Sequence, residues 1–543
     1  MGQGYLVVKL FLADQAMPVE NLEVLIYDEA GNLLHTLITD QNGVTEKVAL
    51  AAPNKEHAFD PYNGALRYGI YRVEVPLSEG LQRTIVHNVE IFDTVDTTLP
   101  IQMQPAIVGN TPEQNTEEIF IPLEHGVDLP DQRALSQINQ ESARQASEFG
   151  PIELAEIAPA ISTPIERSLF GTPTTPVLAN EVAIPSHITV HLGRPNATAP
   201  TVRVPFIDYI KNVACSEIYP TWEDAALYAN IYCQISFALN RLYTRWYPSQ
   251  GFNFDITNST SVDQFYVHGR EIFENISQIV DRIFNMFLRR QGFREPFIAQ
   301  YCNGTTSTCA GLSQWGSQFL ALRGFTPIEI LHYYFPNDIN IVESTNFAEG
   351  VGSFGGVPLR EGSVGDDVHT MQIYLNRISG NFFIPPVGFP EGVFRSSTTE
   401  AVRAFQNINN LPVTGIIDKD TWYAITRIYF AVRRVAELDS EGRRIGIGTT
   451  PPRTVLRLNA RGRYVVELQF LLNFISAYLP DIPFVVENGV YREETRDAVI
   501  AFQRHFNLLV DGITGPQTWG KLYEVYWSIQ DDLAANSGPA ANS

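Results

Sequence analysis

The sequence predicts a multidomain protein with an N-terminal all-β sandwich, an extended connector, a central domain and two small three-helix modules. Three observations carry this prediction. A chain of 543 residues is too long for one core, because a domain averages roughly 150 residues. Short apolar runs separated by turn sequences fill its first part, and its last third repeats itself at a constant offset, as from Leu359 to Leu456.

The composition limits the classes of partner. A hydrophobic fraction of 44% and an aromatic fraction of 11% exclude disorder along the whole chain. A net charge of −22 argues against nucleic acid, so a polymer partner is expected to be recognised through hydroxyls, amides and ring faces. Four cysteines in so long a chain exclude a disulfide scaffold.

Residues 1–104 are predicted to form the β-sandwich. Its first run, Tyr5–Leu12, is interrupted by Lys9 and lacks a basic leader or a cleavage site, so we expect a strand and a chain made without a signal peptide. No run of about 18 apolar residues predicts a membrane span. The turn Thr39–Gly43 and the later Tyr71–Val75 resemble transthyretin-like domains. The other predicted strands are Leu22–Tyr27, Leu33–Ile38 and Thr84–Ile91.

Residues 105–185 are rich in Gln, Asn, Glu, Pro and Thr, which is typical of an extended, protease-accessible connector. One short helix is expected around Gln132–Glu148. The repeat then defines modules at 355–436 and 450–527, followed by a tail at 528–543 that we expect to be disordered. Because units this small need every large side chain inside, four aromatic residues are assigned to the cores: Phe405, Trp422, Phe502 and Trp519.

Both modules resemble the peptidoglycan-binding domain 1 family. The motifs are Gly365-Asp366-Asp367-Val368, Gly392-Val393-Phe394 and Ala401-Val402-Arg403-Ala404-Phe405-Gln406 in the first copy, and Gly489-Val490-Tyr491 and Ala498-Val499-Ile500-Ala501-Phe502-Gln503 in the second. The resemblance implies binding to the bacterial wall; it does not say which residues touch glycan.

The central segment, residues 186–345, carries the candidate chemistry. Glu217 lies before the break at Pro220, where we expect no helix dipole to act on it, among the apolar and aromatic residues Ile218, Tyr219 and Trp222. A carboxyl group in such surroundings is suited to act as a general acid at neutral pH. From these residues alone, Glu217 is a candidate acid or a structural glutamate.

Two stretches of this segment resemble the stage II sporulation protein D (SpoIID)/LytB family. They are Tyr209–Val213 with Glu217-Ile218-Tyr219-Pro220-Thr221-Trp222, and Gly311–Ser317 with Ile330-Leu331-His332-Tyr333-Tyr334. The resemblance implies an α+β catalytic domain in which Glu217 is the catalytic acid of a lytic transglycosylase. Family positions that often hold Gln and Arg read Asn230 and Ile235 here, and the zinc-binding stretch of some members reads Asp255–Phe265 without Cys or His, so no metal or other cofactor is expected.

A narrower resemblance covers nearly the whole chain. With Gln234–Arg241 and Tyr301–Thr306, the architecture is similar to the clostridial spore-cortex-lytic enzymes of the SleC type, although the second wall-binding module is a difference. The resemblance implies a germination enzyme that cleaves the MurNAc–GlcNAc bonds of spore-cortex peptidoglycan to 1,6-anhydro products. It also implies a spore location, synthesis in the mother cell as a zymogen, and a protease that acts on the N-terminal region.

Several alternatives stay open. Candidate sugar-positioning groups are Tyr301, Asn303, Ser313, Gln314 and Trp315, although core packing or loop capping explains all but Gln314 equally well. A hydrolytic glycosidase would need a second carboxylate, for which Asp255 and Asp263 are the candidates. Cys302 and Cys309 form a disulfide or stay reduced, and their spacing does not favour zinc. The competing function is a non-catalytic wall-binding protein or amidase modifier.

Overall fold

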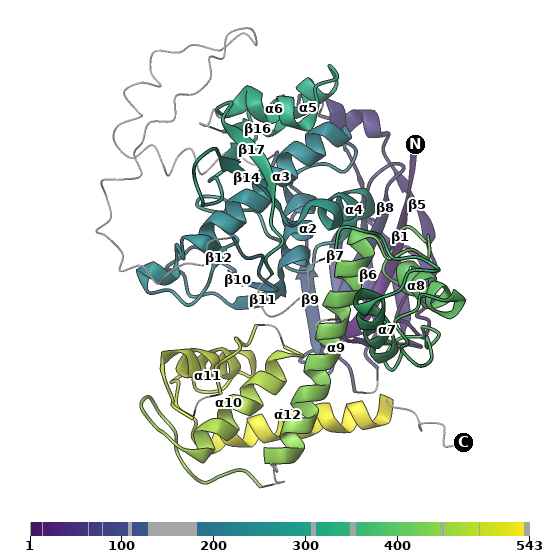
Figure 1. The fold of residues 1–543 in the computed structure, drawn as a ribbon. Coiled ribbons are helices and arrows are strands. Elements are labelled where there is room, and N and C mark those ends of the chain that lie inside the picture. Colours follow the sequence, from purple (N-terminus) through teal and green to yellow (C-terminus); the bar gives the residue numbers. More distant parts are fainter. Residues whose placement is uncertain are drawn as a thin grey trace, which may run out of the picture.

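The structure is a computed structural model, and it describes residues 2–13, 15–62, 64–78, 80–106, 111–128, 182–305, 311–347, 354–445, 447, 450–479, 481–487 and 489–536. Figure 1 shows the N-terminal strands beside a central mixed domain, with one helical module against the strands and the other at the end of the molecule.

Two five-stranded sheets form the N-terminal β-rich region, and all five predicted apolar runs lie in their strands. In the first sheet the order is β13-β8-β1-β2 with β5 beside β1, and in the second it is β4-β3-β6-β7-β9. Side chains alternate between buried and partly exposed along β1, as expected for a strand with one face on a core. The strands are β1 (Gly2–Leu12), β2 (Met17–Pro18), β3 (Glu23–Asp28), β4 (Leu33–Ile38), β5 (Val48–Ala52), β6 (Gly69–Val75), β7 (Arg83–Ile91), β8 (Asp96–Gln102) and β9 (Thr116–Phe120), with a 3₁₀ helix η1 (Lys55–Phe59).

The predicted boundary at residue 104 is wrong, because β9 lies beyond it and pairs in parallel with β7. The polar composition of Thr116–Phe120 hid this strand in the predicted connector. The central domain also adds a strand to the sandwich, since β13 (Ile272–Phe273) pairs antiparallel with β8. The short helix predicted at 132–148 lies outside the described residues, as does most of the predicted connector.

The central domain mixes helices with small sheets and is closed by a bridge between Ile184 and Phe347, close to its predicted ends. The buried α3 (Asp224–Tyr243) runs through its middle, with α2, α5, α6 and β14 packed around it. Its other elements are β10 (His187–His191), β11 (Thr201–Pro205), α2 (Phe206–Glu217), η5 (Pro248–Gln250), β12 (Ile256–Thr257), α4 (Glu274–Ile283), β14 (Met286–Arg290), β15 (Tyr301–Cys302), β16 (Leu312–Ser313), α5 (Gln314–Ala321), α6 (Pro327–Tyr334) and β17 (Ile339–Glu343).

Each C-terminal module is a three-helix unit, and the repeat in the sequence is a repeat in space. Buried glutamines tie the helices to the turns in the same way in both copies: Gln372 and Gln469 each accept a hydrogen bond from a glycine N–H at 3.0 and 2.9 Å. The four aromatic residues predicted as core are all buried. The helices are α7 (Asp366–Ile378), α8 (Ser396–Ile408) and α9 (Lys419–Ile445), then α10 (Arg463–Ser476), α11 (Glu493–His505) and α12 (Pro516–Asn536).

The tail predicted to be disordered from residue 528 instead continues α12 as far as Asn536, because Ile529 is buried against the module. Likewise α9 runs beyond the predicted end of the first module at 436, toward the second module (Figure 1). Among the described residues, no helix combines the length and the apolar character needed to cross a membrane.

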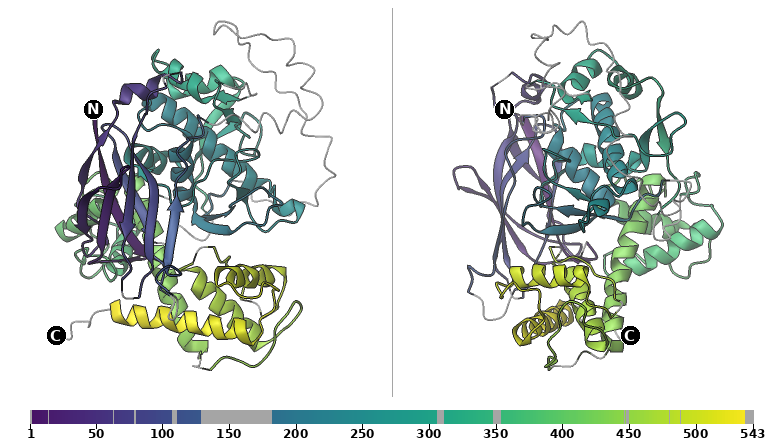
Figure 2. Two further views of the ribbon diagram at one scale, coloured as in Figure 1. Left: turned by 180° about the vertical axis from the view of Figure 1, so that it is seen from behind. Right: turned by 90° about the vertical axis from the view of Figure 1, so that its left-hand side faces the viewer.

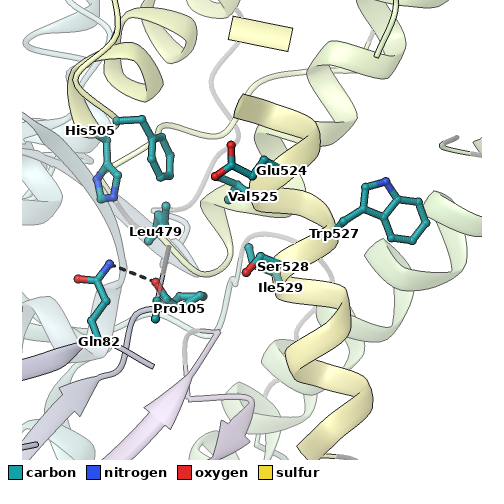
Figure 3. Close-up of a pocket in the computed structure, with 11 residues that line it drawn as sticks. Gln82, Pro105, Leu479, His505, Glu524, Val525, Trp527, Ser528 and Ile529 are labelled. Atoms are coloured by element: carbon teal, nitrogen blue, oxygen red, sulfur yellow. Dashed lines mark hydrogen bonds between the residues drawn. The ribbon is translucent and has the colours of Figure 1, made fainter. Parts of the chain in front are cut away.

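The modules pack against the sandwich rather than extending away from it (Figure 2). In the first module, Asn410 donates to the Thr98 hydroxyl at 2.7 Å. In the second, the backbone of Tyr478 accepts from Gln102 at 2.9 Å, and a cavity of about 290 Å³ separates Pro105 from α12 (Figure 3). The sandwich therefore contacts the central domain and both modules.

Candidate active site

Glu217 is the last residue of α2, and its side chain is buried. The expectation that no helix dipole acts on it is wrong, because the helix extends further toward Pro220 than the sequence indicated. At a helix C-terminus the exposed carbonyl groups disfavour a negative charge. The carboxylate must therefore be stabilised by donors from elsewhere in the fold.

Those donors come from three separate segments. Oε1 accepts hydrogen bonds from the Phe265 N–H at 2.9 Å and from the Tyr301 hydroxyl at 3.0 Å. Oε2 accepts from the Gln314 side-chain amide at 3.2 Å. The immediate surroundings of the carboxylate are thus polar, whereas the neighbours in the sequence suggested apolar ones. A buried carboxylate with several donors is held in one orientation.

One face of this carboxylate is covered by residues 121–128, which we name the covering segment. Its backbone pairs with the end of α2: Gly126 N–H donates to the Ser216 carbonyl at 2.8 Å, and Val127 N–H to the Glu217 carbonyl at 3.0 Å. A Cβ atom added to Gly126 would lie 2.0 Å from Glu217 Oε2. Only glycine permits this close an approach of backbone to carboxylate.

The end of the covering segment is held by a polar cluster. Asp128 accepts from the Tyr219 hydroxyl and pairs with Arg67 Nη1 at 3.1 Å. Arg67 in turn lies over the rings of Tyr219 and Trp315. The indole of Trp222 donates to the carbonyl of Ala58 in η1 at 3.1 Å. The sandwich thus contacts the two aromatic residues that follow Glu217.

A second, fully buried cluster joins the sandwich to the central domain beside the covering segment. His125 contacts Glu90 Oε2 at 2.6 Å, and Arg270 Nη1 reaches the same oxygen at 3.3 Å. Glu271 Oε1 accepts from the Glu90 N–H at 3.1 Å. Burial raises the pKa of Glu90 and of Glu271 to about 8, whereas burial and then the charge of Arg270 lower the pKa of His125. At neutral pH one guanidinium faces two largely protonated carboxyl groups.

The five predicted sugar-positioning residues lie in different places. Tyr301 and Gln314 contact Glu217 directly. Ser313 caps α5 by accepting from the Gly316 N–H at 2.9 Å, and the buried Asn303 accepts from Thr305 N–H at 3.1 Å. Trp315 is buried with its ring centroid 4.9 Å from that of Trp222. The last three therefore have structural contacts, as the alternative interpretation allowed.

Both candidates for a second carboxylate are engaged by other groups. Asp263 pairs with Arg241 at 3.0 Å and accepts from Thr257. Asp255 accepts from the Thr189 hydroxyl at 2.6 Å. Neither carboxylate is therefore idle, and the donors shown at Glu217 are a backbone amide, a phenol and an amide side chain.

The cysteines separate into two kinds. Cys215 and Cys233 are free and buried, and burial raises the pKa of the Cys215 thiol to about 12, which makes it a weak nucleophile. Cys302 belongs to a disulfide. Its predicted partner, Cys309, lies outside the described residues, so the pairing stays a prediction. Among the described residues, no group of three or more His, Cys, Asp or Glu side chains is placed to hold a metal ion.

Three features of the site were not predicted from the sequence. The Phe265 N–H is a backbone donor, which leaves no side-chain signature. Gln264 orients Tyr301, since its amide donates to the phenol at 3.1 Å while its oxygen accepts from Tyr209. Gly126 lies in the stretch assigned to the connector. For Gln264 a signal existed, because it lies within the stretch Asp255–Phe265 that the sequence comparison had already singled out.

The comparisons with known proteins concern the modules. Residues 364–425 and 461–522 match the family described as putative peptidoglycan binding domain. Two peptidoglycan-binding modules support a cell-wall-binding protein. No curated protein matches the chain. A solved structure titled "The Bacillus anthracis TIE protein" is 20% identical over 19% of this chain and 18% of that chain, with a TM-score of 0.15. The chain thus spans about a fifth of that structure.

Proposed function

We propose that the chain is a lytic transglycosylase that degrades spore-cortex peptidoglycan during germination and is made in a latent form. The observation that carries the proposal is one buried carboxyl group, Glu217, held by donors from three separate segments of the central domain. The peptidoglycan-binding modules supply attachment to the wall. The SpoIID-like and SleC-type resemblance supplies the reaction class and the spore location.

In this proposal the two oxygens of Glu217 have different roles. Oε1 is anchored by two donors, so Oε2, on the side of Gly126, is the oxygen that would face a glycan once the covering segment moves away. As an acid, Glu217 protonates the glycosidic oxygen between MurNAc and GlcNAc. As a carboxylate it then deprotonates the muramic 6-hydroxyl, which attacks C1 and closes the 1,6-anhydro ring. No water and no second carboxylate takes part.

The position of the covering segment supports the proposed latency. Glu217 is 1% exposed, and backbone from the sandwich stands where a glycan would have to reach Oε2. We propose that a protease cuts in the connector and that the sandwich then separates from the central domain. The connector and the covering segment adjoin in the chain, so a cut there removes the covalent tether of the segment.

Mass spectrometry of digested cortex tests the reaction. After cleavage of the chain within residues 129–181, we expect anhydro-muropeptides from the wild type and none from Glu217→Gln. Glu223→Gln is the matched control, because Glu223 is exposed and its side chain makes no capping hydrogen bond to α3. Reducing-end products would replace the proposal with hydrolysis, and an absence of glycan cleavage would leave the non-catalytic wall-binding alternative.

A further inference from the structure

A cavity of about 220 Å³ lies where the sandwich, the central domain and the first module meet. Its walls come from β1 and β8, from α2 and from α9, three parts of the chain that are distant in the sequence (Figure 1). This volume has room for several water molecules, and so for a small ion that keeps part of its hydration. The cavity is separate from the Glu217 carboxylate, whose contacts are described above.

Lys9 lines this cavity and is the residue that interrupts the apolar run of the first strand. Along β1 the residues on its side of the strand alternate with the buried ones, so its side chain leaves the sandwich core on the outer face of the sheet. In the described part of the chain its ammonium makes no hydrogen bond or ion pair. Lys9 is partly buried, and a cation with reduced access to water and no partner is costly.

The neighbouring cations are paired, which singles out Lys9. Lys211 lies 2.8 Å from Asp281. Arg427 Nη1 lies 3.2 Å from Asp208, which also accepts from Gln15 at 3.0 Å. A guanidinium has five N–H donors, and Nη1 is the only nitrogen of Arg427 with a described partner, so donors remain on a side chain that lines the cavity.

The acidic residues that line the cavity do not neutralise the Lys9 ammonium. Glu117 and Glu274 also line the cavity, but burial raises the pKa of each to about 7, so a large share of each is neutral at physiological pH. Burial and then the charge of Arg427 lower the pKa of Lys9 itself to about 8, although the charge of Asp208 opposes this. Asp208 already accepts hydrogen bonds from Arg427 and Gln15.

We propose that this cavity binds a small oxyanion, a phosphate or a carboxylate, between the Lys9 ammonium and the unused N–H groups of Arg427. Such an ion connects the sandwich to the first module across α2, the helix that ends in Glu217. It therefore binds the assembled form of the chain and stabilises it by mass action. The proposal for this site does not depend on the proposed reaction, because binding of the ion can be measured without any glycan.

Isothermal titration calorimetry of the full chain tests the site with two probes, inorganic phosphate and succinate, each against a chloride background. We expect one ion to bind per chain and the affinity to fall at least tenfold in Lys9→Gln. Lys47→Gln is the matched control, because Lys47 lies on the same domain, is half exposed and pairs with Asp96 outside the cavity. Binding of phosphate alone assigns the cavity to tetrahedral oxyanions, and binding of succinate alone assigns it to carboxylates.

A second measurement guards against a misfolded variant. Without added oxyanion, Lys9→Gln is expected to unfold at the same temperature as the wild type or higher, because the substitution removes an undercompensated cation. A lower unfolding temperature would mean that Lys9 has a protein partner, which overturns the proposal. It is equally overturned if neither probe binds to the wild type at 10 mM, about a hundredfold weaker than useful binding near 0.1 mM, or if Lys9→Gln binds as tightly as the wild type.

Discussion

The peptidoglycan-binding modules and the Glu217 site both depend on a buried polar side chain that orders the backbone around it, but they differ in where the partners come from. In the modules, Gln406 and Gln503 bond only to residues of their own module. At Glu217 the donors belong to the central domain, while one face is closed by the covering segment of the sandwich. The contacts of these glutamines are local to each module, whereas the candidate active site is composite.

This difference would separate attachment to the wall from the proposed catalysis. The glutamine contacts hold each module through its own residues, although both modules also bond to the sandwich. A composite site changes when either of its parts moves. In the proposed lytic transglycosylase, glycan cleavage would therefore be switched through the sandwich without any change in the residues proposed to perform it.

The largest expected effect comes from Gly126→Ala. The new methyl group would lie 2.0 Å from Glu217 Oε2, and a backbone held by hydrogen bonds to α2 cannot retreat without breaking them. We expect the uncut variant to release cortex fragments at least ten times faster than the uncut wild type. Gly64→Ala is the control, because a Cβ there meets nothing within 4 Å.

Labelling of Glu217 by a carbodiimide and an amine, read by mass spectrometry, tests the covering segment without requiring enzyme activity. The wild type and Gly64→Ala should be protected, and Gly126→Ala should be labelled. Equal protection in all three proteins would contradict a covering role, even if the enzyme proposal is correct.

The next largest effect is expected from Gln503→Leu in the second module. The Gln503 amide donates to the Ile513 carbonyl at 3.0 Å, and its oxygen accepts from the Gly512 N–H at 2.9 Å. Leucine leaves these buried groups without partners, which costs about 3 kcal/mol. Hydrogen exchange should show lost protection in the second module alone, and Gln406→Leu should do the same in the first. Lost protection in both modules from one substitution would show that the glutamine contacts of one module also support the other.

The sequence predicted the modules better than the active site, for a physical reason. Module contacts are local and repeated, so the spacing of Val368, Met371 and Leu375 and the constant offset were enough to predict helices and core. At the site, Glu217 meets Tyr301 and Gln314 from far along the chain, and only a resemblance singled these residues out. Gly126 could not be found, because its role depends on an absent side chain and on a long-range contact.

The pH should change the contact between the sandwich and the central domain. Burial raises the pKa of Glu90 and Glu271 to about 8, above the value of about 4.3 for an unfolded glutamate. Groups whose folded pKa is raised contribute stability that is complete below the unfolded pKa and is lost as pH rises through the folded one. Between pH 6 and pH 9 these two carboxyl groups ionise, whereas the charge of Arg270 stays constant. The contact of the sandwich with the central domain should therefore weaken over this range.

Limited proteolysis of the covering segment at pH 6, 7.5 and 9 measures this loss, and we expect the rate to rise several-fold. Glu271→Gln is the matched variant, because glutamine resembles the protonated carboxyl group that prevails at neutral pH. It should be cut like the wild type at pH 6 and show a weaker increase at pH 9. His125 acts in the opposite sense at low pH, since its pKa is lowered, so an increase below pH 6 would be assigned to it.

The smallest expected effect concerns the surface of the modules. Val413 and Val510 occupy the same position of the repeat and are 53% and 44% exposed, so neither is needed for its core. An apolar side chain kept outside both copies is suited to lie against the face of a sugar ring. The double substitution Val413→Ser with Val510→Ser should weaken binding to purified cortex about fivefold, equivalent to about 1 kcal/mol. Val364→Ser is the control, because Val364 is 73% exposed while its counterpart in the second module is Arg461. If the control weakens binding as much as the double variant, binding to the wall depends on exposed apolar side chains in general and not on the repeated position.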